Sequence, residues 1–569
     1  MRSIQTVPFR INKSIMSIIR EFDYVIVGAG SAGCVLANRL SADPEVSVLL
    51  VEAGPMDRSI FIHMPSAFAW PLADDKYNWY YESAPEPHMD NRSMYCPRGR
   101  VLGGSSSING MCYVRGHALD YDRWAGNRLP SWSYANCLPY FKKSETWEHG
   151  ADEYRGDSGP LHVTDGPCKN PLYEAFIEAG AQAGYPTTTD MNGHQQEGFG
   201  HMQMTTHKGQ RWSTAKAYLK PILARENLSV MINTMTNRIL FDDNCAIGIE
   251  VTQASHTHAV HAKREVICCG GAINSPQLLM ISGIGDAEQL KAHDIPVVAD
   301  LKGVGENLQD HLEIYVQMAC TQPITLYSAT KPLNKLRIGI EWLLFQTGLG
   351  ATNHFEAGGF IRSDKGVEQP DLQYHFLPMA VTYDGKSAVE GHGYQVHVGP
   401  MRATSRGCVK LKSSSPLDHP EIQFNYMGTE QDRKEMRAAV RLTREVMAQD
   451  AFKPFRGEEL APGKEAQSDA DIDAFVRAFG ESAYHPCGTC KMGIADDPTA
   501  VVDEDLKVHG VQGLRVVDAS IMPSIVSGNL NAPTIMIAEK AADVILGNTP
   551  LAVSTATPYQ AKDWQNVQR

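Results

Sequence analysis

A glycine-rich turn near the start constrains the fold of this chain more than any other feature. The apolar run at residues 24–27 is typical of a buried parallel strand, and GAGSAG at 28–33 leads from it into a helical pattern. A second apolar run, 46–51, ends at Glu52, 24 residues after Gly28. A strand, three glycines, a helix, a strand and an acid in this order predict a Rossmann-like α/β unit that binds an adenine dinucleotide.

Each residue of this turn has a physical role in binding. Gly28 permits the tight turn, Gly30 lets the backbone approach a pyrophosphate, and Gly33 lets the helix pack on the strand. The N–H groups of the helix start, where Ser31 stands, bind the pyrophosphate. Glu52 accepts hydrogen bonds from a ribose 2′-hydroxyl and repels a 2′-phosphate, which disfavours NADP. The pattern does not distinguish NAD from FAD.

Composition indicates a large, folded, acidic protein. The 569 residues include 52 Lys and Arg against 65 Asp and Glu, which gives a net charge of −13. This excess of acid disfavours nucleic acid as the main partner, because phosphate binding needs concentrated positive charge. A hydrophobic content of 43% excludes a disordered chain. Only 12 Cys are present, too few for a disulfide scaffold, so we expect a reduced intracellular compartment.

The first twenty residues are basic and contain no acid. They carry Arg2, Arg10, Lys13 and Arg20 but no long apolar run, so they do not match a secretory signal. One interpretation is a transit segment or a segment that touches a membrane. The other, which we favour, takes Met16 as the natural start.

Two later stretches, 266–285 and 519–538, are uncharged and 20 residues long, the length of a membrane span. Both contain prolines and side-chain amides, so we expect buried strand–turn–helix segments instead. Further glycine-rich or strand–acid patterns follow the first one. They are a diglycine followed by hydroxyls at 99–109, a Gly-Gly turn after an apolar strand at 265–276, a strand ending at Asp518, and a helix starting at Pro533.

These segments resemble the two signatures of the glucose-methanol-choline (GMC) oxidoreductases, flavoproteins that oxidise alcohols. The first continues from 99–109 through Tyr113 and Gly116, and the second runs from 271–276 to 282–285. The resemblance extends over about residues 22–547. It implies an α/β fold with a Rossmann-like FAD-binding domain and a second α+β substrate domain built on a mainly antiparallel sheet.

The resemblance also implies domain boundaries and further cofactor contacts. The FAD-binding domain would comprise 21–165, 206–310 and 500–550, the substrate domain 166–205 and 311–499, with an extension at 1–20 and a tail at 551–569. Gly103, Gly104, Ser105, Asn109, Asp518, Asn531 and Pro533 would contact or adjoin the FAD. Some relatives attach FAD covalently through a histidine at the position that Ile108 occupies here, so we expect noncovalent FAD.

Alcohol oxidation needs a base for the hydroxyl proton and an acceptor for the hydride. Histidine suits the first role because its ordinary pKa is near 6.5. By resemblance, His485 is the base or alkoxide partner and Asn529 orients the hydroxyl. An isolated histidine would more often be structural. Cys487 and Cys490 have the spacing of a zinc or redox pair, but no second pair accompanies them, so we expect packing and no metal.

The substrate residues are predicted from a resemblance to the branch of the family that oxidises choline. A trimethylammonium group cannot donate hydrogen bonds, so its site needs aromatic faces and a carboxylate. Glu356 is the candidate carboxylate, Tyr484 and Trp70 are candidate aromatic walls, and His392 completes the pocket. The alternatives are a salt-bridged acid for Glu356 and core packing for Trp70.

The implied reaction converts choline to betaine aldehyde, with further oxidation to glycine betaine left open. Its electrons would pass to a quinone or respiratory acceptor. Two other functions stay open: oxidation of a neutral primary or aliphatic alcohol within the same family, and a lyase or noncatalytic flavin protein. The location would be cytoplasmic, with peripheral attachment to the inner membrane as an option, or mitochondrial if the basic start is a transit peptide. A homo-oligomer is a further option.

Overall fold

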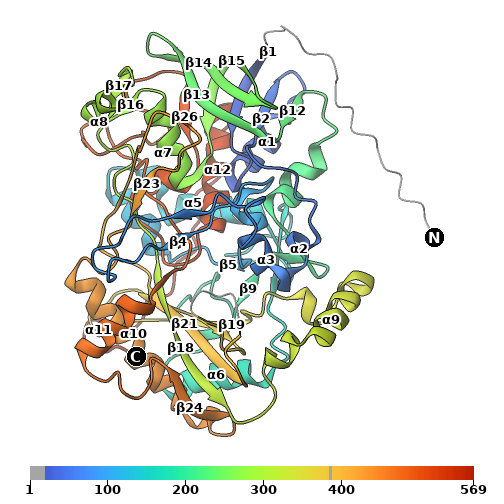
Figure 1. Ribbon diagram of the computed structural model, residues 1–569, viewed down its shortest axis with the longest axis vertical. Coiled ribbons are helices and arrows are strands. Elements are labelled where there is room, and N and C mark those ends of the chain that lie inside the picture. The colour runs from blue at the N-terminus through green and yellow to red at the C-terminus, as the bar shows by residue number, and fades with distance from the viewer. Residues whose placement is uncertain (1–19, 383–387) are drawn as a thin grey trace.

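In the computed structural model, the described residues are 20–382 and 388–569. The predictions about the basic start and Met16 therefore fall outside them, apart from Arg20, which begins the first strand. The molecule has two halves, each built around a seven-stranded sheet (Figure 1).

The first sheet contains the predicted dinucleotide-binding unit. Strand β1 (Arg20–Val27) lies between β2 (Val48–Val51) and β15 (His256–Cys268) and is parallel to both. The sheet also contains β12 (Leu228–Met231), β13 (Thr234–Asp242), β14 (Cys245–Gln253) and β26 (Leu514–Val516). Residues 24–27 and 48–51 are buried or nearly so, as expected for parallel strands covered on both faces.

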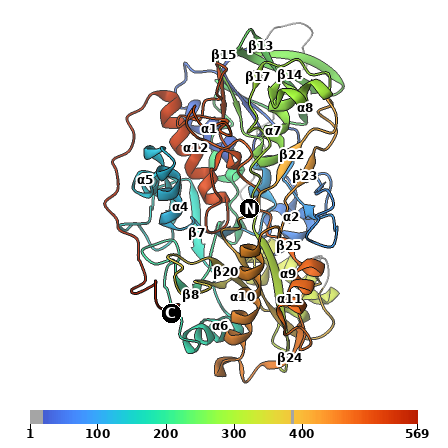
Figure 2. The same ribbon diagram turned by 90° about the vertical axis from the view of Figure 1, so that its left-hand side faces the viewer.

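Three helices place their first turns beside this sheet. Helix α1 (Ser31–Leu40) follows β1 through the glycine turn, and α7 (Gly271–Ile281) follows β15. Helix α12 (Asn531–Leu546) lies along α1 (Figure 2). The predicted helix at Pro533 is therefore present and begins two residues earlier. The second long uncharged stretch ends within α12 and the first spans the end of β15 and α7, so both form buried structure. Across the described residues, no helix has the length and hydropathy needed to span a membrane.

The second sheet is antiparallel throughout, which confirms the predicted fold class. Its strands are β24 (Arg456–Ala461), β18 (Leu312–Cys320), β21 (Gly393–Pro400), β20 (Leu372–Leu377), β19 (Ala357–Ile361), β8 (Gly198–His201) and β25 (Glu481–Ser482). Helices α6 (Pro171–Gln182), α10 (Glu430–Met447) and α11 (Asp469–Phe479) lie in the same half (Figure 2). All the strands of this sheet come from the segments assigned to the substrate domain, and the exact domain boundaries remain our proposal.

The remaining helices and short strands lie outside the two seven-stranded sheets (Figure 1). The helices are α2 (Ile60–His63), α3 (Ala69–Leu72), α4 (Ala118–Gly126), α5 (Tyr134–Ser144), α8 (Ala287–Ala292) and α9 (Pro332–Phe345). Short strands β5 (Cys112–Tyr113), β9 (Gln203–Met204), β7 (Leu161–Asp165) and β6 (Glu145–Trp147) form a four-stranded sheet. Two-stranded pairs are formed by β3 (Tyr81–Glu82) with β4 (Tyr95–Cys96), β10 (Thr206–His207) with β11 (Gln210–Arg211), β16 (Ile284–Gly285) with β17 (Ala299–Asp300), and β22 (Cys408–Lys410) with β23 (Glu421–Gln423).

Candidate active site

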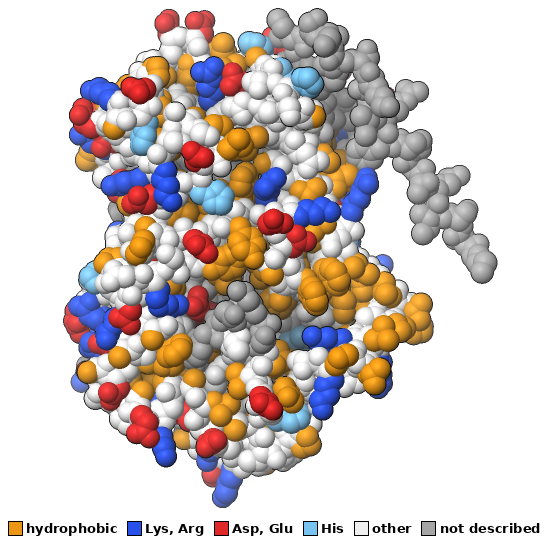
Figure 3. All heavy atoms as spheres, in the orientation of Figure 1, with side chains coloured by type: hydrophobic (Ala, Val, Ile, Leu, Met, Phe, Trp, Pro, Cys, Tyr) orange, Lys and Arg blue, Asp and Glu red, His pale blue; other side chains and the backbone are white. Residues whose placement is uncertain are grey.

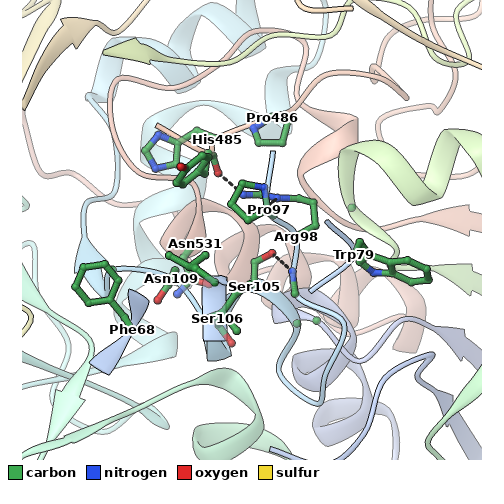
Figure 4. A pocket seen from close by; sticks show the side chains of 18 of the residues that line it. Phe68, Trp79, Pro97, Arg98, Ser105, Ser106, Asn109, His485, Pro486 and Asn531 are labelled. Carbon is green, nitrogen blue, oxygen red and sulfur yellow. Dashed lines mark hydrogen bonds between the residues drawn. The ribbon is translucent and has the colours of Figure 1, made fainter. Parts of the chain in front are cut away.

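A cavity of about 1100 Å³ is lined by residues from both halves of the molecule. Glu52 and the glycine turn line the part nearest the first sheet, and His485 lines the part nearest the second. Figure 4 shows His485, Asn531, Asn109 and Phe68 around this space. One continuous cavity therefore joins the predicted dinucleotide pattern to the predicted catalytic histidine.

The glycine turn has the geometry that close backbone contact requires. Gly28 has a φ of +102°, and a Cβ on Gly33 would lie 1.9 Å from the Gly28 carbonyl oxygen. Gly28, Gly30 and Ser31 line the cavity, whereas Gly33 packs behind them. The Glu52 carboxylate accepts hydrogen bonds from the N–H groups of Ala29 and Gly54, each at 2.9 Å. Burial raises the pKa of Glu52 to about 7.

The segment 103–109 lies directly against this turn. Gly104 has a φ of +52°, and a Cβ there would lie 2.7 Å from the Cα of Gly30. Ser105 Oγ accepts a hydrogen bond from the N–H of Gly99 (Figure 4). Asn109 Oδ1 accepts one from the buried Arg211 at 2.8 Å. Gly104, Ser105 and Asn109 line the cavity; Gly103, at a φ of +89°, supports them from outside the lining.

We predict that Gly104→Ala weakens FAD binding by at least about tenfold, because the added methyl group meets Gly30 and the left-handed backbone is unfavourable for alanine. The FAD-to-protein ratio after purification and a titration with FAD measure this effect. Gly126→Ala is the matched control, because nothing lies within 4 Å of a Cβ at the end of α4. Equal flavin content in the two variants would contradict the prediction.

Asp518 joins two of the predicted cofactor segments. Its Oδ2 accepts hydrogen bonds from the N–H of Gly271 at 2.8 Å and from Ser275 Oγ at 2.6 Å. Asn531 Oδ1 accepts one from Ser31 Oγ at 2.7 Å, which ties the start of α12 to the start of α1. Asp518 and Asn531 line the cavity, whereas Pro533 is buried in the first turn of α12 outside the lining.

These features fit FAD. The glycine cradle leaves room for a pyrophosphate where Cβ atoms would clash, and the starts of α1 and α12 direct their N–H groups to the cavity. Glu52 stands where the motif places an acid for a ribose hydroxyl, and it lines the same cavity as His485. Ile108, buried at 1% exposure, is aliphatic and cannot form the histidine linkage, so noncovalent FAD stays our prediction.

His485 lies in a chain of side-chain hydrogen bonds. Its Nε2 is 3.1 Å from Asn529 Nδ2, and its Nδ1 is 3.1 Å from Nδ1 of the buried His311. His311 Nε2 is in turn 3.1 Å from the carbonyl oxygen of Met401. Gln373 Nε2 donates to Asn529 Oδ1 at 3.1 Å. The structure thus brings together the two predicted catalytic residues.

The Met401 carbonyl determines which ring nitrogens of His311 and His485 carry protons. Because a carbonyl only accepts, His311 carries its proton on Nε2 and accepts at Nδ1. His485 therefore carries its proton on Nδ1 and has a lone pair on Nε2, the nitrogen that meets Asn529. Burial is the main cause that lowers the pKa of His485 well below 6.5, and the electrostatic effects of His311, His375 and Arg98 disfavour a charged imidazolium further. Nε2 is thus available as a base at neutral pH.

We predict that Asn529→Asp moves the acidic limb of the kcat/KM profile to higher pH by about 1 unit or more. In the parent enzyme activity falls only when the pH drops through the lowered pKa of His485. A carboxylate at this position favours the imidazolium and so raises that pKa. Asn237→Asp, which adds the same charge on β13 near the Glu52 end of the cavity, should leave the limb in place. An unmoved limb in Asn529→Asp would refute this assignment of the base.

Besides Glu52 and Asp518, the carboxylate of Glu313 on β18 lines the cavity. It was not the carboxylate predicted for the substrate site. Its Oε1 is 2.9 Å from Nδ1 of His397 on β21. The ring of Phe355 lies 5.2 Å from that of His397, and Phe355 and Tyr484 both line the cavity. Burial, followed by the nearby charges of Glu481 and Glu313, raises the pKa of Tyr484. Glu313, Phe355 and Tyr484 therefore line the same cavity as His485.

Two predicted substrate residues do not reach this cavity. Glu356 is 3% exposed, and its Oε1 accepts a hydrogen bond from Thr352 Oγ1 at 2.6 Å, away from the lining. His392 contacts Thr325 Oγ1 at 2.7 Å, also outside the lining. Trp70 lines the outer part of the cavity, is 59% exposed and stacks on Phe61. Of the four candidates, only Tyr484 and Trp70 line the cavity, and only Tyr484 adjoins His485.

Sequence reasoning missed Glu313, His375, His397, His311 and Arg98. His375 and His397 are directly paired across β20 and β21, and His397 is paired with Tyr315 across β21 and β18. An alternating pattern in 312–320 could have shown that Glu313 and Tyr315 share one face of a strand. Arg98 donates to the carbonyl oxygen of Tyr484 at 2.6 Å, a contact between distant segments (Figure 4).

Comparison with known proteins identifies the family of this chain. Models described as GMC oxidoreductase match residues 22–313 and 403–538. The chain belongs to the GMC oxidoreductase family. It is 59% identical over 547 residues to mitochondrial choline dehydrogenase of Mus musculus, covering 95% of this chain and 92% of the relative. It is 54% identical over 545 residues to an oxygen-dependent choline dehydrogenase of Brucella ovis, covering 96% and 99%.

A solved structure agrees with this assignment. An FAD-dependent oxidoreductase from Chaetomium thermophilum matches this GMC oxidoreductase with a TM-score of 0.84 and 28% identity, covering 92% of this chain and 99% of that one. The predictions of the family, the two-domain fold, an FAD-dependent alcohol oxidoreductase and FAD as cofactor are confirmed. The individual site residues remain assignments from geometry.

Proposed function

We propose that this GMC oxidoreductase oxidises choline to betaine aldehyde. The observation that carries the proposal is the Glu313 carboxylate, held by His397 in the same cavity as His485. A quaternary ammonium cannot donate hydrogen bonds, so it is recognised by negative charge and by aromatic faces. Glu313 supplies the charge, and Phe355 and Tyr484 supply faces. The choline dehydrogenases among the relatives support the same substrate.

The chemistry follows from the lone pair on His485. The alcohol hydroxyl enters between His485 and Asn529, donates to Nε2 and accepts from Asn529 Nδ2. A bound FAD would supply the acceptor for the hydride of the alcohol carbon. His485 takes the hydroxyl proton at Nε2 as the carbonyl forms, while its Nδ1–H remains donated to His311. Asp310 holds the backbone at this position, because its Oδ1 accepts a hydrogen bond from the backbone N–H of His485 at 2.7 Å.

We propose that the electrons then pass to a quinone or another respiratory acceptor. A lipid-soluble acceptor requires the enzyme to reach a membrane, so peripheral attachment is part of this proposal. The location is the cytoplasmic side of an inner membrane, or the mitochondrion if the basic start acts as a transit peptide. Relatives named as mitochondrial support the second location.

The test is anaerobic mixing of the purified holoenzyme with choline while the visible flavin absorbance is followed. Bleaching that saturates with choline supports the proposal. If choline leaves the flavin oxidised and a neutral primary alcohol bleaches it, the family chemistry stands and the choline assignment is wrong. If no alcohol bleaches the flavin, the dehydrogenase function itself is wrong.

A further inference from the structure

Helix α9 is a surface helix whose apolar side chains face solvent. Trp342 is the one residue of its fourteen that is buried, with its Nε1 donating to the carbonyl oxygen of Gly209 at 2.7 Å. Leu333, Leu336, Ile340, Leu343, Leu344 and Phe345 are between 48% and 82% exposed. The first five recur at spacings of three and four, so they form one stripe along the helix. The stripe points away from the protein instead of into its core.

The apolar surface extends beyond α9. Phe61 on α2 is 43% exposed and stacks at 5.2 Å on Trp70 of α3, and Leu349 beyond α9 is 41% exposed. Figure 3 shows hydrophobic side chains gathered on the right of the molecule, where Figure 1 places α2, α3 and α9. We call this surface, made by α9 with Phe61, Trp70 and Leu349, the α9 face. An apolar surface this continuous is unusual on a soluble monomer and marks a contact site.

The charges around the α9 face are opposite to those of the whole chain. Residues 326–350 contain three cations, Lys331, Lys335 and Arg337, and one acid, Glu341, although the chain carries −13 overall. All three cations are exposed. Among the described residues, none of the three forms a salt bridge. They are therefore free to meet negative charge on a partner.

This arrangement distinguishes between two occupants. A second copy of the chain, packed symmetrically, would bring the same three cations toward one another. An anionic phospholipid surface would take the leucines into its acyl region and the cations at its headgroups, as amphipathic helices at interfaces do. Tryptophan also favours that interfacial depth, and Trp70 is 59% exposed. Charge complementarity therefore favours the membrane.

We propose that the α9 face docks on an anionic phospholipid bilayer. This deepens the peripheral attachment proposed above and rests on it, by naming the surface that makes the contact. Trp70 and Lys335 also line the cavity, so the α9 face borders the cavity entrance. Docking there places the entrance at the membrane, where a lipid-soluble acceptor and the reduced flavin can approach.

The experiment is co-sedimentation of the holoenzyme with vesicles of phosphatidylcholine alone or of phosphatidylcholine with phosphatidylglycerol. We expect binding to the anionic vesicles, and a partition coefficient at least about tenfold lower for Leu343→Asp/Leu344→Asp. Arg337→Glu should weaken binding to the anionic vesicles and reduce its dependence on salt. Leu417→Asp is the matched control, because Leu417 is 75% exposed and lies outside the α9 face.

Turnover of choline with a soluble dye separates this proposal from the proposed function. Leu343 and Leu344 are outside the cavity lining, so the double variant should retain dye-linked activity while losing vesicle binding. Absence of dye-linked activity in the parent enzyme would count against the proposed function alone. The proposed docking surface is wrong if the parent protein does not bind anionic vesicles. It is also wrong if the double variant binds them as well as the parent does. If the double substitution instead dissociates an oligomer, the α9 face contacts a second copy of the chain and the proposal is wrong.

Discussion

Replacing His485 by alanine is expected to lower kcat/KM for choline by about 10²- to 10⁴-fold, the range typical of a lost general base. The hydroxyl proton would have no acceptor, because Asn529 offers an amide and His311 is buried with its pKa lowered to about 4. Steady-state turnover and the anaerobic rate of flavin bleaching measure the loss. Bound FAD should be unchanged, since the glycine cradle is untouched.

His392→Ala provides the control for this experiment. Both residues belong to the substrate half, but His392 does not line the cavity: it contacts Thr325, also outside the lining, and packs behind Tyr327. Its removal should change kcat/KM by no more than a few fold. Similar losses in the two variants would mean that His485 acts through the fold, and the base would have to be sought elsewhere in the cavity, with His375 the first candidate.

Replacing Glu313 by glutamine is expected to lower kcat/KM for choline by about 30-fold or more, mainly through KM. The change keeps the shape of the side chain and its contact with His397 but removes the negative charge that attracts the ammonium. An alcohol in which carbon replaces the ammonium nitrogen should be oxidised almost equally by the parent and the variant. Steady-state kinetics on the two alcohols separates the effect of charge from the effect of shape.

Glu356→Gln is the matched control, because it neutralises a buried carboxylate that is bonded to Thr352 outside the cavity. Glu356 should therefore matter little for choline relative to the neutral alcohol. If Glu356→Gln instead shows the selective loss, the carboxylate predicted from sequence is the right one and the geometric assignment to Glu313 is wrong.

Local sequence patterns sufficed for the dinucleotide half of the molecule. The strand, glycine turn, helix and acid at 24–52 are contiguous in the chain, so a short window contains the whole geometric argument. Asp518 was predicted at a strand end, and its hydrogen bonds to Gly271 and Ser275 explain why an acid belongs there. These contacts follow from parallel strands that end at one edge of a sheet.

The substrate half could not be derived in this way. Glu313, His375 and His397 meet because three antiparallel strands pair in one register, and a shift of one residue would turn each side chain to the other face. The residues next to positions 313 and 397 in the sequence do not indicate that register. The sequence around Glu356 matches the pattern expected for the substrate site. The fold nevertheless places Glu356 behind the cavity wall, against Gly166.

The hydrogen-bond chain behind His485 also determines the route of the abstracted proton. Beyond Nδ1 the chain ends at the Met401 carbonyl, which holds no exchangeable proton, and His311 is fully buried. A proton taken up at Nε2 thus has no exit through the protein along this chain. It must return to solvent through the cavity, past the place where the aldehyde forms. The aldehyde and the proton of His485 therefore leave through the same part of the cavity. An aldehyde that stays bound there keeps His485 protonated.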